Sequence, residues 1–103
     1  MASEKQLIKR ARKYDQQTLA EIYDRYSPGI FRYAVRLLND SEQAENCVSE
    51  TFSRFLTALQ RGGGPKDHLQ AYLYRIAHNW ITDQYRRRPS LPLDARVGDD
   101  IGL

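Results

Sequence analysis

The chain has 103 residues, of which 41% are hydrophobic and 28% charged, and its formal net charge is +3. This length suits one domain and is short for two, and the composition is that of a soluble globular protein. Nothing in the chain approaches the run of about 18 apolar residues that would cross a bilayer, so we expect no membrane insertion and, by default, a cytoplasmic protein. The single cysteine, Cys47, excludes an internal disulfide.

Charge is unevenly distributed along the chain. Residues 1–14 carry a net charge of +4, residues 15–60 of −3, residues 61–88 of +4 and residues 89–103 of −2. An acidic middle beside a basic segment predicts two differently charged partners, one for each surface.

Apolar residues recur at steps of three and four along most of the chain, a spacing that predicts helices and no strands. We expect a short first helix capped by Ser3 and a second capped by Asp15. A boundary is predicted at Ser27 and Pro28, because proline is tolerated in a first helical turn. The apolar stripe expected for the second helix is Leu19, Ile22, Tyr23 and Tyr26.

A third helix is expected to end at Asn39 and Asp40, a fourth to follow directly, and a fifth to span residues 69–88. The sequence therefore predicts an all-α fold, a compact bundle of four to five helices over residues 1–88. The Pro-, Asp- and Gly-containing segment 89–103 is predicted to be a flexible, linker-like tail.

The fourth helix, residues 41–60, has the clearest amphipathic pattern. Three glycines and a proline within residues 61–65 must end it. Its core stripe is Ala44, Cys47, Val48, Phe52, Phe55, Leu56 and Leu59. Its polar stripe is Glu42, Glu45, Asn46, Ser49 and Ser53, with Glu50 at the flank. Because Cys47 lies on the apolar side, we expect it to be a buried packing residue.

The last helix combines a core-forming side with a cationic, hydrogen-bonding side. Its apolar stripe is Leu69, Tyr72, Leu73, Ile76, Ala77, Trp80 and Ile81. The opposite face carries Arg75, His78, Asn79, Thr82 and Arg86, and the helix ends in Arg87 and Arg88. Such a face suits phosphates and base edges, although a solvated face with a cationic last turn is the simpler alternative. Trp80 could stack on a base, but its place in the stripe favours the core.

Four strings in collinear order resemble region 2 of the extracytoplasmic-function (ECF) group of bacterial sigma factors. The strings are LAEIYDRYSP at 19–28, FRYAVRLLND at 31–40, AENCVSETF at 44–52, and YLYRIAHN continuing through Asp83 to YRRR at 72–88. Together they cover roughly residues 15–88. The third string resembles the family's region 2.2 and the fourth its regions 2.3 and 2.4.

The resemblance implies a transcription initiation domain that binds core RNA polymerase and recognises and helps melt the promoter −10 element. In the family the region 2.2 helix docks on a coiled coil of the polymerase β′ subunit. The matching positions here are Asn46, Ser49 and Glu50, and Glu42 and Glu45 add acidic character. Many relatives carry Asp and Gln at the positions of Asn46 and Ser49, so this chain lacks one charge and some hydrogen-bonding reach.

For promoter DNA, the resemblance implies that the loop 61–68 and the last helix hold an unstacked base of the non-template strand. The loop candidates are Arg61, Lys66 and His68, and the helix candidates are Arg75, His78, Asn79, Thr82, Asp83, Arg86, Arg87 and Arg88. Gly62, Gly63 and Gly64 would let the backbone approach a base closely, although a flexible connection suits them equally. Asn79 and Asp83 stand where the family has its polar pair, and Asp83 could instead pair with Arg86 or Arg87.

The family's partners are core polymerase, promoter DNA and, in addition, an anti-sigma factor, and no cofactor is implied. An enzyme is not expected, because His68 and His78 lack metal-ligand spacing and no phosphate-cradling motif is present. Two alternatives remain: a stand-alone DNA-binding domain that acts without polymerase, and a helical interaction module that has lost DNA binding. Complete family members carry a second DNA-binding domain, region 4, and we expect it to be absent from this chain.

Overall fold

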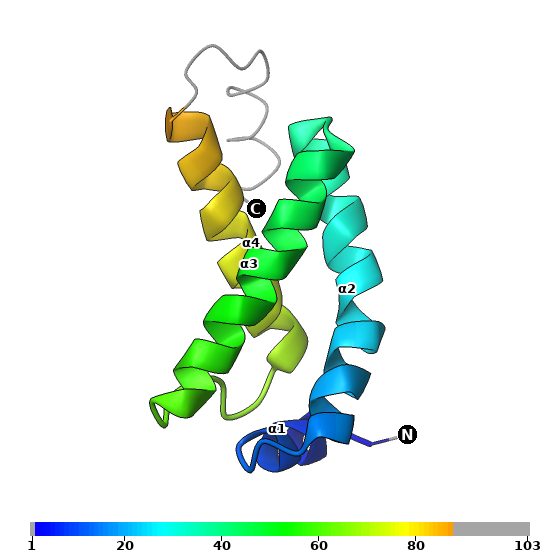
Figure 1. Cartoon of the computed structure of the whole chain (residues 1–103), viewed down its shortest axis with the longest axis vertical. Helices are drawn as coiled ribbons and strands as arrows, with labels where there is room; N and C mark the ends of the chain where they lie inside the picture. Colours follow the sequence, from blue (N-terminus) through cyan, green and yellow to red (C-terminus); the bar gives the residue numbers. More distant parts are fainter. Residues whose placement is uncertain (1, 88–103) are drawn as a thin grey trace.

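The computed structural model describes residues 2–87, and they form four helices (Figure 1). The helices are α1 (Glu4–Ala11), α2 (Gln16–Leu38), α3 (Ser41–Gln60) and α4 (Leu69–Arg87). Helices α2 and α3 run antiparallel, α4 packs against α3, and the short α1 lies across the end where α2 begins. Within the described residues there is no strand, which confirms the all-α prediction. None of these helices is long and apolar enough to cross a membrane.

The boundary predicted at Ser27 and Pro28 is wrong, because α2 continues through both residues. Proline has no N–H, so the bond to the carbonyl four residues earlier is lost at this point. The buried stripe nevertheless runs on across the proline, from Ile22 and Tyr26 to Ile30 and beyond. Packing of one continuous apolar face therefore outweighs the lost bond.

The core is made of stripes from all four helices. Its buried hydrophobic residues are Leu7, Ile8, Ala11, Ile22, Tyr26, Ile30, Ala34, Leu37, Ala44, Cys47, Val48, Phe52, Phe55, Leu59, Leu69, Leu73, Ala77, Ile81 and Tyr85. The predicted burial of Cys47 is confirmed, and Trp80 is half-buried against this core. Tyr23, which was predicted in the stripe of α2, is instead 45% exposed. At Gly29, α2 and α4 approach so closely that a Cβ atom would lie 2.5 Å from the Tyr74 hydroxyl oxygen.

The first three helices are capped by the residue just before them. Ser3 and Gln6 form a reciprocal capping box on α1, and the Asp15 side chain accepts from the Thr18 N–H on α2. Both caps were predicted. Helix α3 begins at Ser41, as expected, and its cap is Asp40, whose Oδ1 accepts from the backbone of α3. Such caps satisfy amide groups that have no partner inside the helix.

The residues after Arg87 are not described. The tail predicted for 89–103, and the side chain of Arg88, therefore lie outside the described residues.

Candidate functional site

The polar stripe of α3 lies on the surface. Glu42, Glu45, Asn46 and Ser49 are exposed, and Glu50 is half-buried. The stripe is exposed because residues at the intervening helical positions are buried in the core. Helix α3 carries three acidic residues, Glu42, Glu45 and Glu50, and one basic residue, Arg54, so its surface is acidic.

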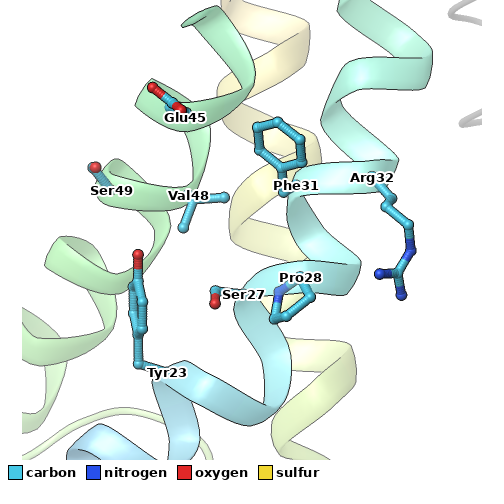
Figure 2. A pocket seen from close by; sticks show the side chains of 8 residues that line it. All are labelled: Tyr23, Ser27, Pro28, Phe31, Arg32, Glu45, Val48 and Ser49. Carbon is cyan, nitrogen blue, oxygen red and sulfur yellow. The ribbon is translucent and has the colours of Figure 1, made fainter. Parts of the chain in front are cut away.

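A groove of about 520 Å³ runs between α2 and α3, beside this acidic surface. Figure 2 shows Phe31 and Val48 in the space between the two helices, with Glu45 and Ser49 on the α3 side. Its other lining residues are Tyr23, Ser27, Pro28 and Arg32. The groove thus combines an apolar floor with polar walls, the usual composition of a protein-binding surface.

Residues of the groove on α2 were not among the predicted site residues. Tyr23 was placed in the core, yet its ring lies at the surface and packs 4.9 Å, centroid to centroid, from Phe52. Tyr23 directly follows the buried Ile22, and a residue next to a buried one lies at the edge of the apolar stripe of a helix. This position was the sequence signal that could have indicated a partly exposed Tyr23.

The loop after α3 begins with a hydrogen-bonded turn. The Gly62 N–H donates to Leu59 O at 3.0 Å and the Gly63 N–H donates to Ala58 O at 2.8 Å. With φ of 80° at Gly62, this pattern is a Schellman motif, which favours glycine at the left-handed position. Gly62 and Gly63 therefore end α3, a role distinct from the close approach to a base that the sequence suggested.

Between this loop and the first turns of α4 lies a hollow of about 370 Å³. Its lining residues are Pro65, Asp67, His68, Ala71, Tyr72 and Arg75. The structure thus brings His68 and Arg75, both predicted, to one site and adds Tyr72, which was predicted only as a core residue. The ring of Tyr72 is half-buried and packs against Phe55 with 6.1 Å between centroids, so one aromatic side chain links the core to the hollow.

The loop cations and the polar face of α4 are largely accessible. Arg61, Lys66, His68, Arg75, Asn79, Arg86 and Arg87 are exposed, whereas His78, Thr82 and Asp83 are half-buried. Asp83 lies 3.9 Å from Arg86, so the simpler pairing considered for it occurs. The Arg86 side chain is 78% exposed and that of Asp83 46%, and a pair so accessible to water contributes little stability. Asp83 and Arg86 therefore stay able to exchange partners.

His78 differs in character from its neighbours on this face. Burial lowers its pKa, which leaves the imidazole neutral at pH 7. Its Nδ1 lies 3.4 Å from the Tyr33 hydroxyl. His78 can take part in hydrogen bonds but does not add to the positive charge of α4.

Two further observations bear on other chemistries. Burial raises the pKa of the Cys47 thiol to about 11, which keeps it protonated and unreactive at neutral pH. No group of three or more His, Cys, Asp or Glu residues within 2–87 is arranged to hold a metal ion.

Comparison with known proteins gives a consistent result. The family model "Sigma-70 region 2" matches residues 22–90. The chain is 33% identical over 100 residues to the ECF RNA polymerase sigma factor SigW of Bacillus subtilis, covering 96% of the chain and 53% of that protein. It is 35% identical over 65 residues to the ECF RNA polymerase sigma factor SigL of Mycobacterium tuberculosis, covering 63% of the chain and 37% of that protein.

A third relative is the ECF RNA polymerase sigma factor BldN of Streptomyces coelicolor. It is 28% identical over 81 residues, which cover 79% of the chain and 31% of that protein. The chain therefore spans about half, or less, of the length of these curated relatives. The search of solved structures found no significant match.

Proposed function

The chain belongs to the sigma-70 region 2 family as a domain of the ECF type, and from this premise we propose how its surfaces divide the work. Helix α3 binds core RNA polymerase, and the loop 61–68 with α4 recognises and helps melt the promoter −10 element. One observation carries the proposal: a single bundle exposes an acidic helix bordering a groove and, elsewhere, a basic loop and helix bordering a hollow. An anti-sigma factor is a further proposed partner, and the cytoplasm the proposed location.

The α2–α3 groove supports docking of a helical, cationic partner such as the β′ coiled coil. A helix laid along the groove would cover Phe31 and Val48, and basic side chains at its edges would reach Glu45. Apolar burial would then supply most of the affinity, while the acidic side chains would set the orientation and the rate of association. Asn46 and Ser49 would contribute hydrogen bonds without charge.

Binding of a purified β′ coiled-coil fragment to the chain tests this half of the proposal. We expect Glu45→Lys to weaken binding by about tenfold or more, because it places like charge at a cationic partner. The matched control is Glu21→Lys, which makes the same charge change at an exposed position of α2 that does not line the groove.

Equal binding by wild type and both variants would remove the docking assignment. If DNA binding persisted in that case, the stand-alone DNA-binding alternative would take its place. Loss of binding in both variants alike would indicate general electrostatics instead of a site.

The hollow beside the loop supports capture of an unstacked base. Pulling a base out of its stack costs a few kcal/mol, which contacts in the pocket and neutralisation of the backbone must offset. At the hollow, the ring of Tyr72 could stack on a base and the guanidinium of Arg75 could contact it. The exposed side chains of Arg61 and Lys66 could bind phosphates. Asn79 lies one helical turn beyond Arg75 on the same exposed face of α4, within the segment that would read base edges.

Two alanine variants separate reading of sequence from binding of phosphates. In binding to single-stranded DNA, Arg87→Ala should lower affinity for all sequences and reduce the salt dependence by about 0.7 in log–log slope. Asn79→Ala should instead relax base preference, with a loss of about 1–3 kcal/mol of discrimination at one position. If the two variants behaved alike, the division of roles on α4 would be refuted.

A further inference from the structure

The N-terminal helix lies before the part of the chain that the family model matches, which begins at residue 22. The residue that follows it and forms its C-cap, Arg12, nevertheless reaches the loop 61–68 with its side chain. The Arg12 guanidinium donates from Nη1 to Gly63 O at 3.0 Å and from Nη2 to Pro65 O at 2.9 Å. A single planar fork thus ties together two loop carbonyls two residues apart, a geometry that arginine provides and lysine does not.

The base of this contact is itself held in place. Leu7, Ile8 and Ala11 bury one side of α1 in the core. Just after the helix, the Tyr14 hydroxyl donates to Leu56 O near the end of α3 at 2.8 Å. Arg12 therefore extends from a short helix that is packed on the bundle and tied to α3.

On the loop side, Arg12 acts where the chain has left α3 and has not yet entered α4. The Schellman motif holds the N–H groups of Gly62 and Gly63, but no backbone hydrogen bond recorded in the described residues reaches from the loop segment 64–67 to the bundle. Pro65 lines the hollow, and its carbonyl is one of the two that Arg12 binds. The guanidinium thus secures the wall of the hollow at the point where main-chain hydrogen bonds are lacking.

We propose that Arg12 is a positioning residue for base recognition: by binding the carbonyls of Gly63 and Pro65 it sets the shape of the hollow that receives the unstacked base. This inference rests on the proposed role of the loop in reading the −10 element. The contact also covers two carbonyl oxygens whose partial negative charge would repel an approaching phosphate. Arg12 does this without touching the base.

The test measures base preference without knowledge of the promoter. The full chain is incubated with a randomised pool of short single-stranded DNA, and the bound fraction is sequenced while total affinity is measured separately. The variants are Arg12→Ala, Arg12→Lys and the matched control Arg10→Ala. The control removes the same charge from the same end of α1, at an exposed side chain with no hydrogen bond or ion pair recorded in the described residues.

We expect Arg12→Ala to reduce the preference of the wild type for its favoured base by about tenfold, the scale of losing charge-assisted hydrogen bonds. Arg10→Ala should keep the base preference. It should lower total affinity only by the loss of one positive charge, a loss that Arg12→Ala shares. Arg12→Lys should fall between the two, since an ammonium group keeps the charge but lacks the planar fork whose two nitrogens each bind one carbonyl. Hydrogen exchange in the loop 61–68 should speed up in Arg12→Ala and stay unchanged in Arg10→Ala, with the rest of the bundle unchanged in both.

Three outcomes would overturn the inference: unaltered base preference in Arg12→Ala, equal loss in Arg10→Ala, or unaltered loop exchange in Arg12→Ala. If the wild type itself showed no base preference, the proposed reading of DNA by the loop would be what failed, and the role of Arg12 would fall with it. A wild type with preference and an Arg12→Ala variant with the same preference would refute the role of Arg12 alone.

Discussion

Helices α3 and α4 share one core but differ in how they begin. Across their contact the Cys47 thiol donates to Ala77 O at 3.8 Å, and the rings of Phe55 and Tyr72 pack edge to face. Helix α3 is capped by its neighbour in sequence, Asp40. At the start of α4, the Gln70 N–H donates to Glu4 Oε2 at 3.0 Å, so the capping carboxylate comes from α1.

This difference shows which parts of the domain are built locally and which depend on distant contacts. The start of the acidic helix α3 is determined by its own neighbouring residue, Asp40. The basic helix, with the loop before it, is held by Glu4 and Arg12, two side chains of the N-terminal segment. We therefore expect substitutions in the N-terminal segment to disturb the proposed DNA-binding surface more than the proposed polymerase-binding surface.

The largest effect is expected from a substitution in the core that α3 and α4 share. Phe55 is 1% exposed and lies between α3 and α4. Phe55→Ala should cost about 3–5 kcal/mol of unfolding free energy, through lost burial and the cavity left behind. Urea unfolding followed by circular dichroism measures this cost. Ser53→Ala, at an exposed position of the same helix, should leave the midpoint nearly unchanged.

Loss of binding at only one of the two proposed surfaces in a folded Phe55→Ala variant would contradict the dependence of both helices on a common core. Loss of both surfaces in parallel with unfolding is the expected result.

A smaller effect should separate the two kinds of cap. Glu4 Oε2 accepts from the Tyr26 hydroxyl at 2.9 Å as well as from α4. Burial, followed by this bond to Glu4, raises the pKa of Tyr26 to about 12, so the hydroxyl keeps its proton and donates. Glu4→Ala should therefore cost about 2 kcal/mol, because it removes charge-assisted bonds to two other helices. Asp40→Ala should cost about 1 kcal/mol, the usual value for a lost N-cap.

Hydrogen exchange locates the two losses. Faster exchange should appear in the first turn of α4 for Glu4→Ala and in the first turn of α3 for Asp40→Ala. Exchange that rose in α3 for both variants would contradict the distinction between local and remote capping.

The sequence was sufficient for those features that depend on neighbouring residues. Helical spacing predicted the all-α fold, the burial of Cys47 and the caps at Ser3 and Asp15, because each follows from residues one to four positions apart. The break at Pro28 was predicted wrongly, since a local preference was outweighed by the packing of a stripe that spans the whole of α2. Local rules carry no information on how much a distant surface gains from that packing.

The candidate site was predictable only in part for the same reason. Exposed positions such as Glu45 and Asn79 follow from helical period. The hollow, in contrast, arises where the loop meets α4, and the α2–α3 groove arises where Tyr23 and Phe31 meet Val48. The contacts of Glu4 and Arg12 join residues more than 50 positions apart in the chain, and no motif in the sequence indicates them.

The smallest expected effect tests the remote cap through its charge. Burial alone would raise the pKa of Glu4, but the N–H of Gln70 and the hydroxyl of Tyr26 stabilise the carboxylate and hold its pKa below the ordinary value of 4.5. A lowered folded-state pKa means that the stabilisation is present above the unfolded-state pKa and is lost as the pH falls through the folded-state value. Wild type should therefore exceed Glu4→Gln in stability at pH 7, and the difference should shrink as the pH falls below 4.5.

Urea midpoints of both proteins across this range measure the difference, and Glu21→Gln, the same substitution at an exposed glutamate of α2, serves as the matched control. Because the amide side chain introduced by Glu4→Gln would keep an acceptor of nearly the same shape, the comparison isolates the negative charge from the hydrogen bond. A difference between wild type and Glu4→Gln that stayed constant with pH would show that the carboxylate caps α4 by its shape alone. A difference that narrowed would show that charge on α1 helps to hold the start of the basic helix, and thus that the position of α4 depends on ionisation in a helix far from it in sequence.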